Sequence, residues 1–200
     1  MTKYVLNSGG IKRQPELKKN FHQELVKSLG DHPKFLLCNF AQGREYWEVK
    51  FAGYSSSVAE DMPADVHPTF ALAMPDTFVA QCKRADVIYF HGGDDHLLQY
   101  WMKQFDLADV FKDKVVATNS ASSDMLATHH WTCDWRSCAD GLAVLPIKFI
   151  PHYQSDFGDD DPRGPIDWQK AYDELRAFGS TDLPIHALKE GEYIVVEKHE

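Results

Sequence analysis

One pattern recurs along the chain and constrains its fold most: a short apolar run, a loop of small or polar residues, then a segment with helical periodicity. Continuous apolar runs of a few residues are typical of strands that are buried on both faces of a sheet. Apolar residues spaced three or four apart are typical of helices that cover such strands. The repeated order strand, loop, helix therefore predicts a three-layer α/β sandwich with a mainly parallel sheet.

The first unit shows the pattern clearly. The run KYVLNSGG (3–10) ends in a glycine pair, and residues 15–30 then carry leucines and a phenylalanine at helical spacing. We predict further strands at 34–41, 70–74, 86–93, 114–119 and 141–153, and further helices at 43–54, 76–85, 95–105, 121–130 and 166–178. Most of 54–70 is predicted as loop and 154–165 as a mobile surface loop. The runs 183–188 and 192–199, joined through Glu190 and Gly191, are predicted to form a hairpin at the sheet edge.

Length and charge limit the partners. The 200 residues fit one α/β domain spanning the chain. A formal net charge of -9 repels phosphate backbones and anionic lipid heads. We therefore expect neither a nucleic-acid nor a membrane partner. The sequence does not determine the oligomeric state, so the question of a homodimer is not decided at this point.

The compartment is predicted from what the chain lacks. Its first residues hold too short an apolar stretch for a signal peptide, and no segment approaches the roughly 18 apolar residues that a spanning helix needs. The four cysteines have no framework spacing, which predicts free thiols in a reducing compartment. A cytoplasmic location follows as the expectation.

Three loops at the predicted carboxyl ends of strands hold residues suited to chemistry. They are HGGDD (91–95), NSASS (119–123) and PHYQ (151–154). Ligands in open parallel sheets bind at these ends. Ser120 stands between a strand and a helix, where backbone N–H groups can stabilise an oxyanion beside a nucleophilic hydroxyl. The alternative interpretation is that Ser120 only caps the helix, since serine is favoured at that position.

Five stretches, read in chain order, carry a resemblance that no single motif conveys. They are LNSGG (6–10), VIYFHGGDDHLL (87–98), TNSASS (118–123), LPIKFIPHY (145–153) and ALKEGEYIVV (187–196). They match an opening strand with a glycine pair, a strand running into Gly-Gly-Asn and a helix, part of a Gly-x-Ser-Ala-Gly elbow, a downstream PHF or PHY, and a final hairpin. In this order they resemble the peptidase E and cyanophycinase family of serine peptidases. The resemblance implies a fold similar to class I glutamine amidotransferases.

The resemblance also implies roles for individual residues. Ser120 matches the nucleophile and His152 the general base. The family places an acid that orients the histidine between these two. The aspartates in that interval are Asp134, whose spacing fits best, with Asp124 and Asp140 behind it. The oxyanion hole corresponds to the backbone N–H groups of Ala121 and of the Gly92-Gly93 loop.

The chain departs from the family pattern at three positions. Thr118 and Ser122 stand where the elbow has glycines, which predicts a different or relaxed turn. Asp94 replaces the asparagine after Gly-Gly and places a carboxylate near the proposed oxyanion hole. These departures define the alternative function, a catalytically silent protein that binds or senses a small molecule or peptide.

The implied substrate is a short aspartyl peptide or a related amide, which needs a cation for its carboxylate. Arg163 is the candidate because a guanidinium binds carboxylates through two hydrogen bonds, with Arg136 as a second choice. Arg163 is equally readable as a solvated arginine among the aspartates of its loop. Asp94 and Arg163 are thus the predicted substrate-contacting residues.

No cofactor or metal is expected. The segment 129–138 gathers His129, His130, Cys133, Asp134 and Cys138, but their spacing lacks the paired ligands of a structural zinc site. The acidic run 156–161 lacks the ligand alternation of an EF-hand loop. The glycine pairs at 9–10 and 92–93 fit neither nucleotide-binding pattern.

Overall fold

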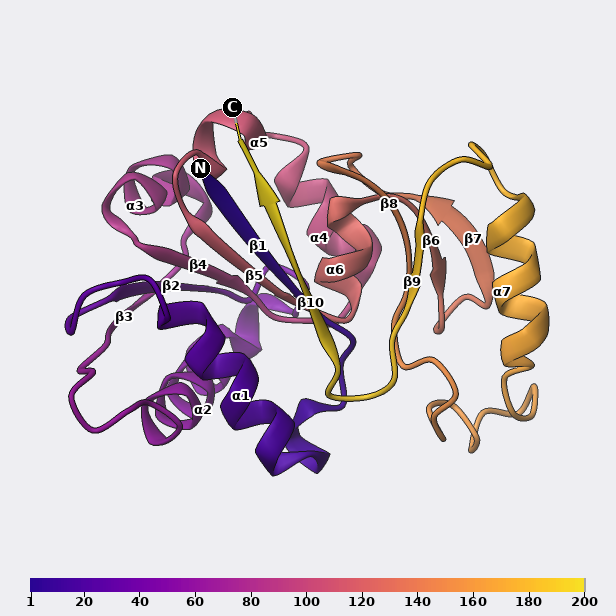
Figure 1. The fold of residues 1–200 in the computed structure, drawn as a ribbon, viewed down its shortest axis with the longest axis horizontal. Helices are drawn as coiled ribbons and strands as arrows, with labels where there is room; N and C mark the ends of the chain where they lie inside the picture. Colours follow the sequence, from indigo (N-terminus) through magenta and orange to yellow (C-terminus); the bar gives the residue numbers. More distant parts are fainter. Residues whose placement is uncertain (200) are drawn as a thin grey trace.

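The computed structural model describes residues 1–199 and forms two sheets (Figure 1). The larger sheet has the strand order β10-β1-β5-β4-β2-β3. Its strands are β1 (Thr2–Asn7), β2 (Lys34–Cys38), β3 (Thr69–Leu72), β4 (Val87–Phe90), β5 (Val115–Asn119) and β10 (Tyr193–Lys198). Neighbouring strands are parallel except β10, which runs antiparallel to β1. The register places Asn7 opposite Asn119, so the loops after β1 and β5 leave the sheet side by side.

Helices cover both faces of this sheet, which confirms the predicted three-layer fold (Figure 1). One face carries α1 (Pro15–Val26) and α2 (Trp47–Glu60). The other carries α3 (Phe78–Arg84), α4 (Asp95–Met102), α5 (Leu107–Phe111) and α6 (Ala121–Leu126). Short 3-10 turns are η1 (Ile11–Arg13), η2 (Arg44–Tyr46) and η3 (Pro75–Thr77). Side chains of each strand alternate between the two cores: Val5 packs with α1, while Tyr4 and Leu6 pack on the opposite face.

The smaller sheet has the order β7-β6-β8-β9. Its strands are β6 (Ala127–Thr132), β7 (Ser137–Asp140), β8 (Leu145–Ile150) and β9 (Ile185–Ala187), and α7 (Trp168–Ala177) packs against it. Apolar side chains of β8 also join the core of the larger sheet, so the two sheets share a core.

A buried lysine links this sheet to α7. Lys148, on β8, donates to the carbonyls of Leu175, Arg176 and Phe178 at 2.8, 3.1 and 2.6 Å. The last carbonyls of a helix have no intrahelical donor, and a cation there also opposes the helix dipole. Lys148 therefore closes the carboxyl end of α7.

Several predicted boundaries were wrong, and two of them are instructive. The α2 helix continues to Glu60, through serines that were predicted as loop. Ser55, for example, donates its hydroxyl proton to the carbonyl of Phe51, one turn earlier in the helix, at 2.8 Å. The predicted helix 121–130 ends at Leu126, and the chain then enters β6. Pairing with β7 and β8 outweighs the local helical pattern there.

The predicted terminal hairpin does not form. Strand β9 pairs with β8 in the smaller sheet, whereas β10 pairs with β1 in the larger one. The segment around Glu190 is therefore a crossing between two sheets, and it runs past the loop after β1, where Gly191 N donates to the carbonyl of Gly9 at 2.8 Å. Among the described residues, no helix is both long and apolar enough to cross a membrane.

Candidate active site

Ser120 forms the turn between β5 and α6 with a backbone conformation that side chains rarely adopt. Its φ is 56° and its ψ is -119°, a conformation that costs about 1–3 kcal/mol. Backbone bonds hold the turn: Ser120 N donates to the carbonyl of Asn7 at 3.0 Å, and Ser123 N donates to the carbonyl of Ser120 at 2.7 Å. The hydroxyl makes no capping bond to the described residues of α6. The helix-cap interpretation of Ser120 is therefore wrong.

The Ser120 hydroxyl instead begins a chain of hydrogen bonds. Its Oγ lies 2.9 Å from Nε2 of His152, and Nδ1 of His152 lies 2.9 Å from Oε1 of Glu190. The side chains of His152 and Glu190 are only 8% and 9% exposed. Because a carboxylate can only accept, the proton sits on Nδ1 and leaves the Nε2 lone pair facing the serine. In this tautomer the histidine can take the serine proton.

Packing fixes the position of the imidazole. The backbone N–H of His152 donates to Oγ of Ser8 at 2.7 Å, and the ring stacks on Phe157 with centroids 4.3 Å apart. Burial lowers the pKa of His152, an effect that the Glu190 carboxylate opposes. The ring is therefore neutral and able to act as a base near pH 7.

The glycine pair after β1 makes room for this chain. A Cβ on Gly9 would lie 2.3 Å from Cε1 of His152, and one on Gly10 would lie 2.2 Å from Cδ of Glu190. Both positions also have positive φ, at 107° and 62°. The glycine pair therefore allows both a left-handed turn and a close approach of the backbone to the histidine and the glutamate.

Hydroxyl groups fill the positions where the family elbow has glycines. Thr118 Oγ1 lies 2.8 Å from Oγ of Ser123, while Ser122 Oγ accepts from the N–H of Asn119 at 2.7 Å and donates to the carbonyl of Phe90 at 2.9 Å. Thr118 and Ser122 are fully buried. The predicted relaxation of the turn is wrong, because Ser120 keeps its positive φ and the new hydroxyls bind the turn itself.

Of the residues proposed for the oxyanion hole, Ala121 and Gly92 lie next to the serine and Gly93 does not. Ala121 is the first residue of α6, so its N–H has no acceptor within the helix. A Cβ on Gly92 would lie 3.2 Å from Cβ of Ser120, which shows how close the two backbones are. Gly93 instead packs on the loop after β2, since its Cβ would lie 2.3 Å from the carbonyl oxygen of Ala41. The hole itself stays a prediction.

The structure places Glu190, and not one of the predicted aspartates, against His152. Asp134 lies in the turn between β6 and β7, where its backbone carbonyl accepts from Arg163. Asp124 is buried in α6, and burial raises its pKa far above the usual range. Asp140 contacts Nδ1 of His129 at 2.7 Å. Glu190 could have been suspected from its place beside Gly191 in ALKEGEYIVV. In the sequence alone, however, this stretch looks like an ordinary turn, and only the structure shows that Glu190 lies against Gly10.

The two predicted substrate-contacting residues have partners within the chain. Asp94 caps α4, accepting from the N–H of Leu97 at 2.8 Å. Arg163 binds Asp161 through two bonds of 2.8 and 2.6 Å. Arg163 nevertheless lines a pocket of about 450 Å³ that also contains Phe157, the residue stacked on His152. Asp94 thus positions a helix, while Arg163 stays within the neighbourhood of the histidine.

The histidines and cysteines of 129–138 have other contacts. His130 Nε2 lies 3.4 Å from Oδ2 of Asp95, and Cys133 Sγ donates to the carbonyl of Pro151. Within residues 1–199, no group of three or more histidine, cysteine, aspartate or glutamate side chains is arranged to hold a metal ion.

Comparison with known proteins finds similar solved structures only. No family model and no curated protein matches the chain. Among solved structures, a peptidase from an acI-B1 Actinobacterium has a TM-score of 0.63 and 21% identity, over 98% of this chain and 83% of its own. A candidate peptidase E from Listeria monocytogenes EGD-e has a TM-score of 0.63 and 13% identity, with both chains fully covered. At these identities the likeness establishes architecture, and the chain accordingly has a peptidase E-like α/β fold.

Proposed function

We propose that the protein is a serine peptidase that hydrolyses short peptides, aspartyl dipeptides or related amides, through an acyl-enzyme on Ser120. The observation that carries the proposal is the buried chain from Ser120 through His152 to Glu190, built on a strained elbow. Strained backbone at the end of a buried strand is typical of nucleophiles. The two similar structures are both described as peptidases, which supports the same reaction class.

The first half-reaction uses the geometry directly. Oγ of Ser120 attacks the carbonyl carbon of the scissile amide while its proton passes to Nε2 of His152, 2.9 Å away. The imidazolium that forms is stabilised by the Glu190 carboxylate. His152 then gives the proton to the leaving amine, and the C–N bond breaks to leave an ester on Ser120. Water completes the second half-reaction, with His152 again taking a proton.

The tetrahedral intermediate needs donors for its oxyanion. The backbone N–H of Ala121 and those of the Gly92-Gly93 loop are proposed for this role, because Ala121 directly follows the serine and Gly92 packs against it. The partial positive charge at the start of α6 would act in the same direction.

The aspartyl preference is the finer part of the proposal. Arg163 would bind the substrate carboxylate, which then competes with Asp161 for the guanidinium. The pocket around Arg163 also holds Arg13 and Arg136, so three guanidinium groups border it. An acidic substrate group would bind there only by replacing the loop aspartates as partners of these guanidinium groups.

The test separates nucleophile reactivity from substrate choice. Wild type, Ser120→Ala and the control Ser137→Ala, a change on exposed β7, are treated with a fluorophosphonate that labels activated serines. The same proteins are assayed on N-terminal aspartyl dipeptides, other dipeptides and chromogenic amides. We expect labelling and turnover in wild type and control, and neither in Ser120→Ala with its folding unchanged.

The alternative, a binding or sensory protein, predicts a pocket without a working serine. The hydrogen bonds of Ser120 and the neutral state of His152 favour the hydrolase over it. Absence of labelling together with absence of turnover on every substrate would reverse that preference. Turnover that survives in Ser120→Ala would reject Ser120 as the nucleophile.

A further inference from the structure

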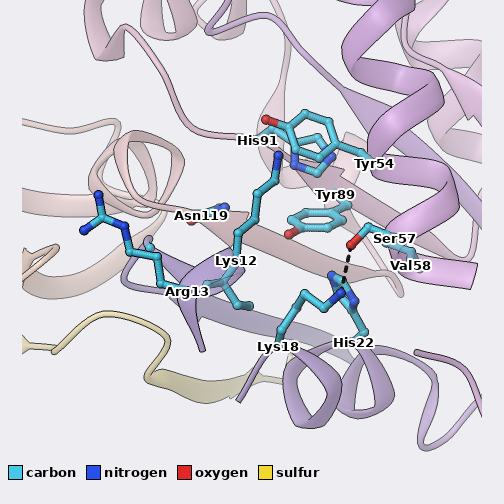
Figure 2. Close-up of a pocket in the computed structure, with 12 residues that line it drawn as sticks. Lys12, Arg13, Lys18, His22, Tyr54, Ser57, Val58, Tyr89, His91 and Asn119 are labelled. Atoms are coloured by element: carbon cyan, nitrogen blue, oxygen red, sulfur yellow. Dashed lines mark hydrogen bonds between the residues drawn. The ribbon is translucent and has the colours of Figure 1, made fainter. Parts of the chain in front are cut away.

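A second pocket borders the proposed active site without containing Ser120, His152 or Glu190. This pocket, here called the α1–α2 pocket, has a volume of about 280 Å³ and lies between the turn after β1, helices α1 and α2, and the ends of β4 and β5. Figure 2 shows its side chains converging from these elements. Two lining residues, His91 and Asn119, directly precede Gly92 and Ser120 in the sequence.

The pocket contains buried polar atoms that have no partner among the described residues. His91 is 1% exposed, and neither Nδ1 nor Nε2 makes a hydrogen bond. Oδ1 of Asn119 is buried and also unpaired. Buried polar groups in folded proteins are nearly always paired, so each exception asks for an explanation. A molecule bound in the adjoining space would supply partners for these atoms together.

Aromatic packing holds the His91 ring in place. Tyr54 stacks on it with centroids 3.5 Å apart and an interplanar angle of 8°, and Tyr89 packs against it at 4.1 Å. Burial lowers the pKa of His91 well below its usual value, with nearby His22, Lys12 and Lys50 adding to the effect. The ring is therefore neutral and offers one N–H donor and one acceptor at fixed positions.

The charge of the pocket is positive. His22 lies 2.6 Å and Lys18 3.3 Å from Oδ2 of Asp61, so these two groups share one carboxylate. Lys12 Nζ lies 5.1 Å above the Tyr54 ring, and within residues 1–199 no carboxylate forms an ion pair with it. Figure 2 shows the Lys12 side chain reaching toward His91 and Tyr54. An ammonium group over an aromatic wall, without a partner acid, suits an anion.

We propose that the α1–α2 pocket binds a small molecule that carries a carboxylate or phosphate together with an N–H or O–H donor. The anionic group pairs with Lys12, and the donor serves the unpaired Oδ1 of Asn119 or the acceptor nitrogen of His91. The donor follows from the chemistry of the pocket, because the carbonyl oxygen of Asn119 can only accept. The proposal is independent of hydrolysis, since binding is measured directly.

Four probes separate the two anionic groups and test the donor. They are inorganic phosphate, phenyl phosphate, 4-hydroxybenzoate and benzoate, titrated calorimetrically and by thermal unfolding at constant ionic strength. We expect saturable binding of the two phosphate probes or of 4-hydroxybenzoate. At a concentration 100 times Kd, the bound probe should raise Tm by about 5–10 °C. Benzoate, which lacks the donor, should bind at least about 10-fold more weakly than 4-hydroxybenzoate.

Variants test the residues. Lys12→Met should weaken binding at least about 10-fold, whereas the control Lys19→Met, on the exposed side of α1, should not change it. His91→Phe keeps the stacked ring and removes both nitrogens. It should abolish binding while leaving the Tm of the empty protein unchanged or higher, because two unpaired buried atoms disappear. A merely structural His91 would instead lower that Tm.

The outcomes decide the proposal. Ser120→Ala should bind the probes as wild type does, so loss of activity and loss of binding are distinguishable. Failure of every probe to bind at about 10 mM would overturn the proposal. Binding that survives in both Lys12→Met and His91→Phe would overturn it equally.

Discussion

Replacing Glu190 with glutamine tests the part of the site that sequence reasoning assigned to another residue. Glutamine keeps the size and one acceptor oxygen of Glu190, and it removes the charge that faces Nδ1 of His152 at 2.9 Å. In the proposed acyl transfer the histidine becomes an imidazolium. The substitution therefore removes an attraction that exists chiefly in the transition state, and we expect kcat to fall with little change in KM.

The magnitude follows from the separation. Coulomb's law at an effective dielectric constant of about 20 gives about 6 kcal/mol for unit charges separated by the observed 2.9 Å. Each 1.36 kcal/mol of barrier is tenfold in rate, so the full effect is about 10⁴-fold. The dipole of the glutamine amide recovers part of this, and we expect a loss of about 10² to 10⁴ in kcat.

The assay compares kcat, KM and Tm of wild type, Glu190→Gln and Asp134→Asn on the best substrate of the panel. Asp134→Asn should lose less than about 5-fold, because Nδ1 of His152 is already bonded to Glu190. A loss below about 10-fold in Glu190→Gln, combined with a larger loss in Asp134→Asn, would refute the reasoning and restore the aspartate as the orienting acid.

Three further predictions follow from geometry and burial. Burial lowers the pKa of His152 below its usual value, and only the neutral ring can accept the serine proton, so kcat/KM should fall on acidification with a midpoint below pH 6.5; a midpoint above pH 6.5 would contradict this. Gly9→Ala places a Cβ 2.3 Å from the His152 ring at a φ of 107°, so activity should fall at least about 100-fold. The control Gly30→Ala, with nothing within 4 Å, should change neither activity nor Tm. Lys148→Met leaves three helix-end carbonyls without their shared donor, so urea unfolding should show a loss of about 2–4 kcal/mol; a loss below about 1 kcal/mol would show that water replaces the lysine.

The larger sheet was predictable because its central strands, β1, β2, β4 and β5, are buried on both faces and therefore appear as continuous apolar runs. The smaller sheet was not. Its strand β6 begins directly after α6, without a loop to mark the change, and β7 and β9 are short strands of partly exposed residues. Strands β6 and β9 are placed by pairing with β8, a contact between separate parts of the chain that local pattern does not encode, and β7 is placed by pairing with β6.

The candidate site was likewise predictable only in part. Ser120 and His152 belong to loops with recognisable motifs, and the structure joins them by a hydrogen bond. Glu190 was read as part of a hairpin because LPIHAL and EYIVVEKH both look like strands of one sheet. Only the separation of β9 and β10 into two sheets brings the glutamate past Gly10 and onto the histidine.

The crossing that carries Glu190 ties the proposed chemistry to the order in which the chain is made. A ribosome delivers Ser120 first, then His152, and Glu190 only with the last part of the described chain, just before the strand that anchors it against β1. A nascent protein, or one clipped before this crossing, would hold the proposed nucleophile and base without the carboxylate that bonds Nδ1 of His152. The proposed activity would therefore be absent while the chain is still being synthesised, and its onset would report that β10 has paired with β1.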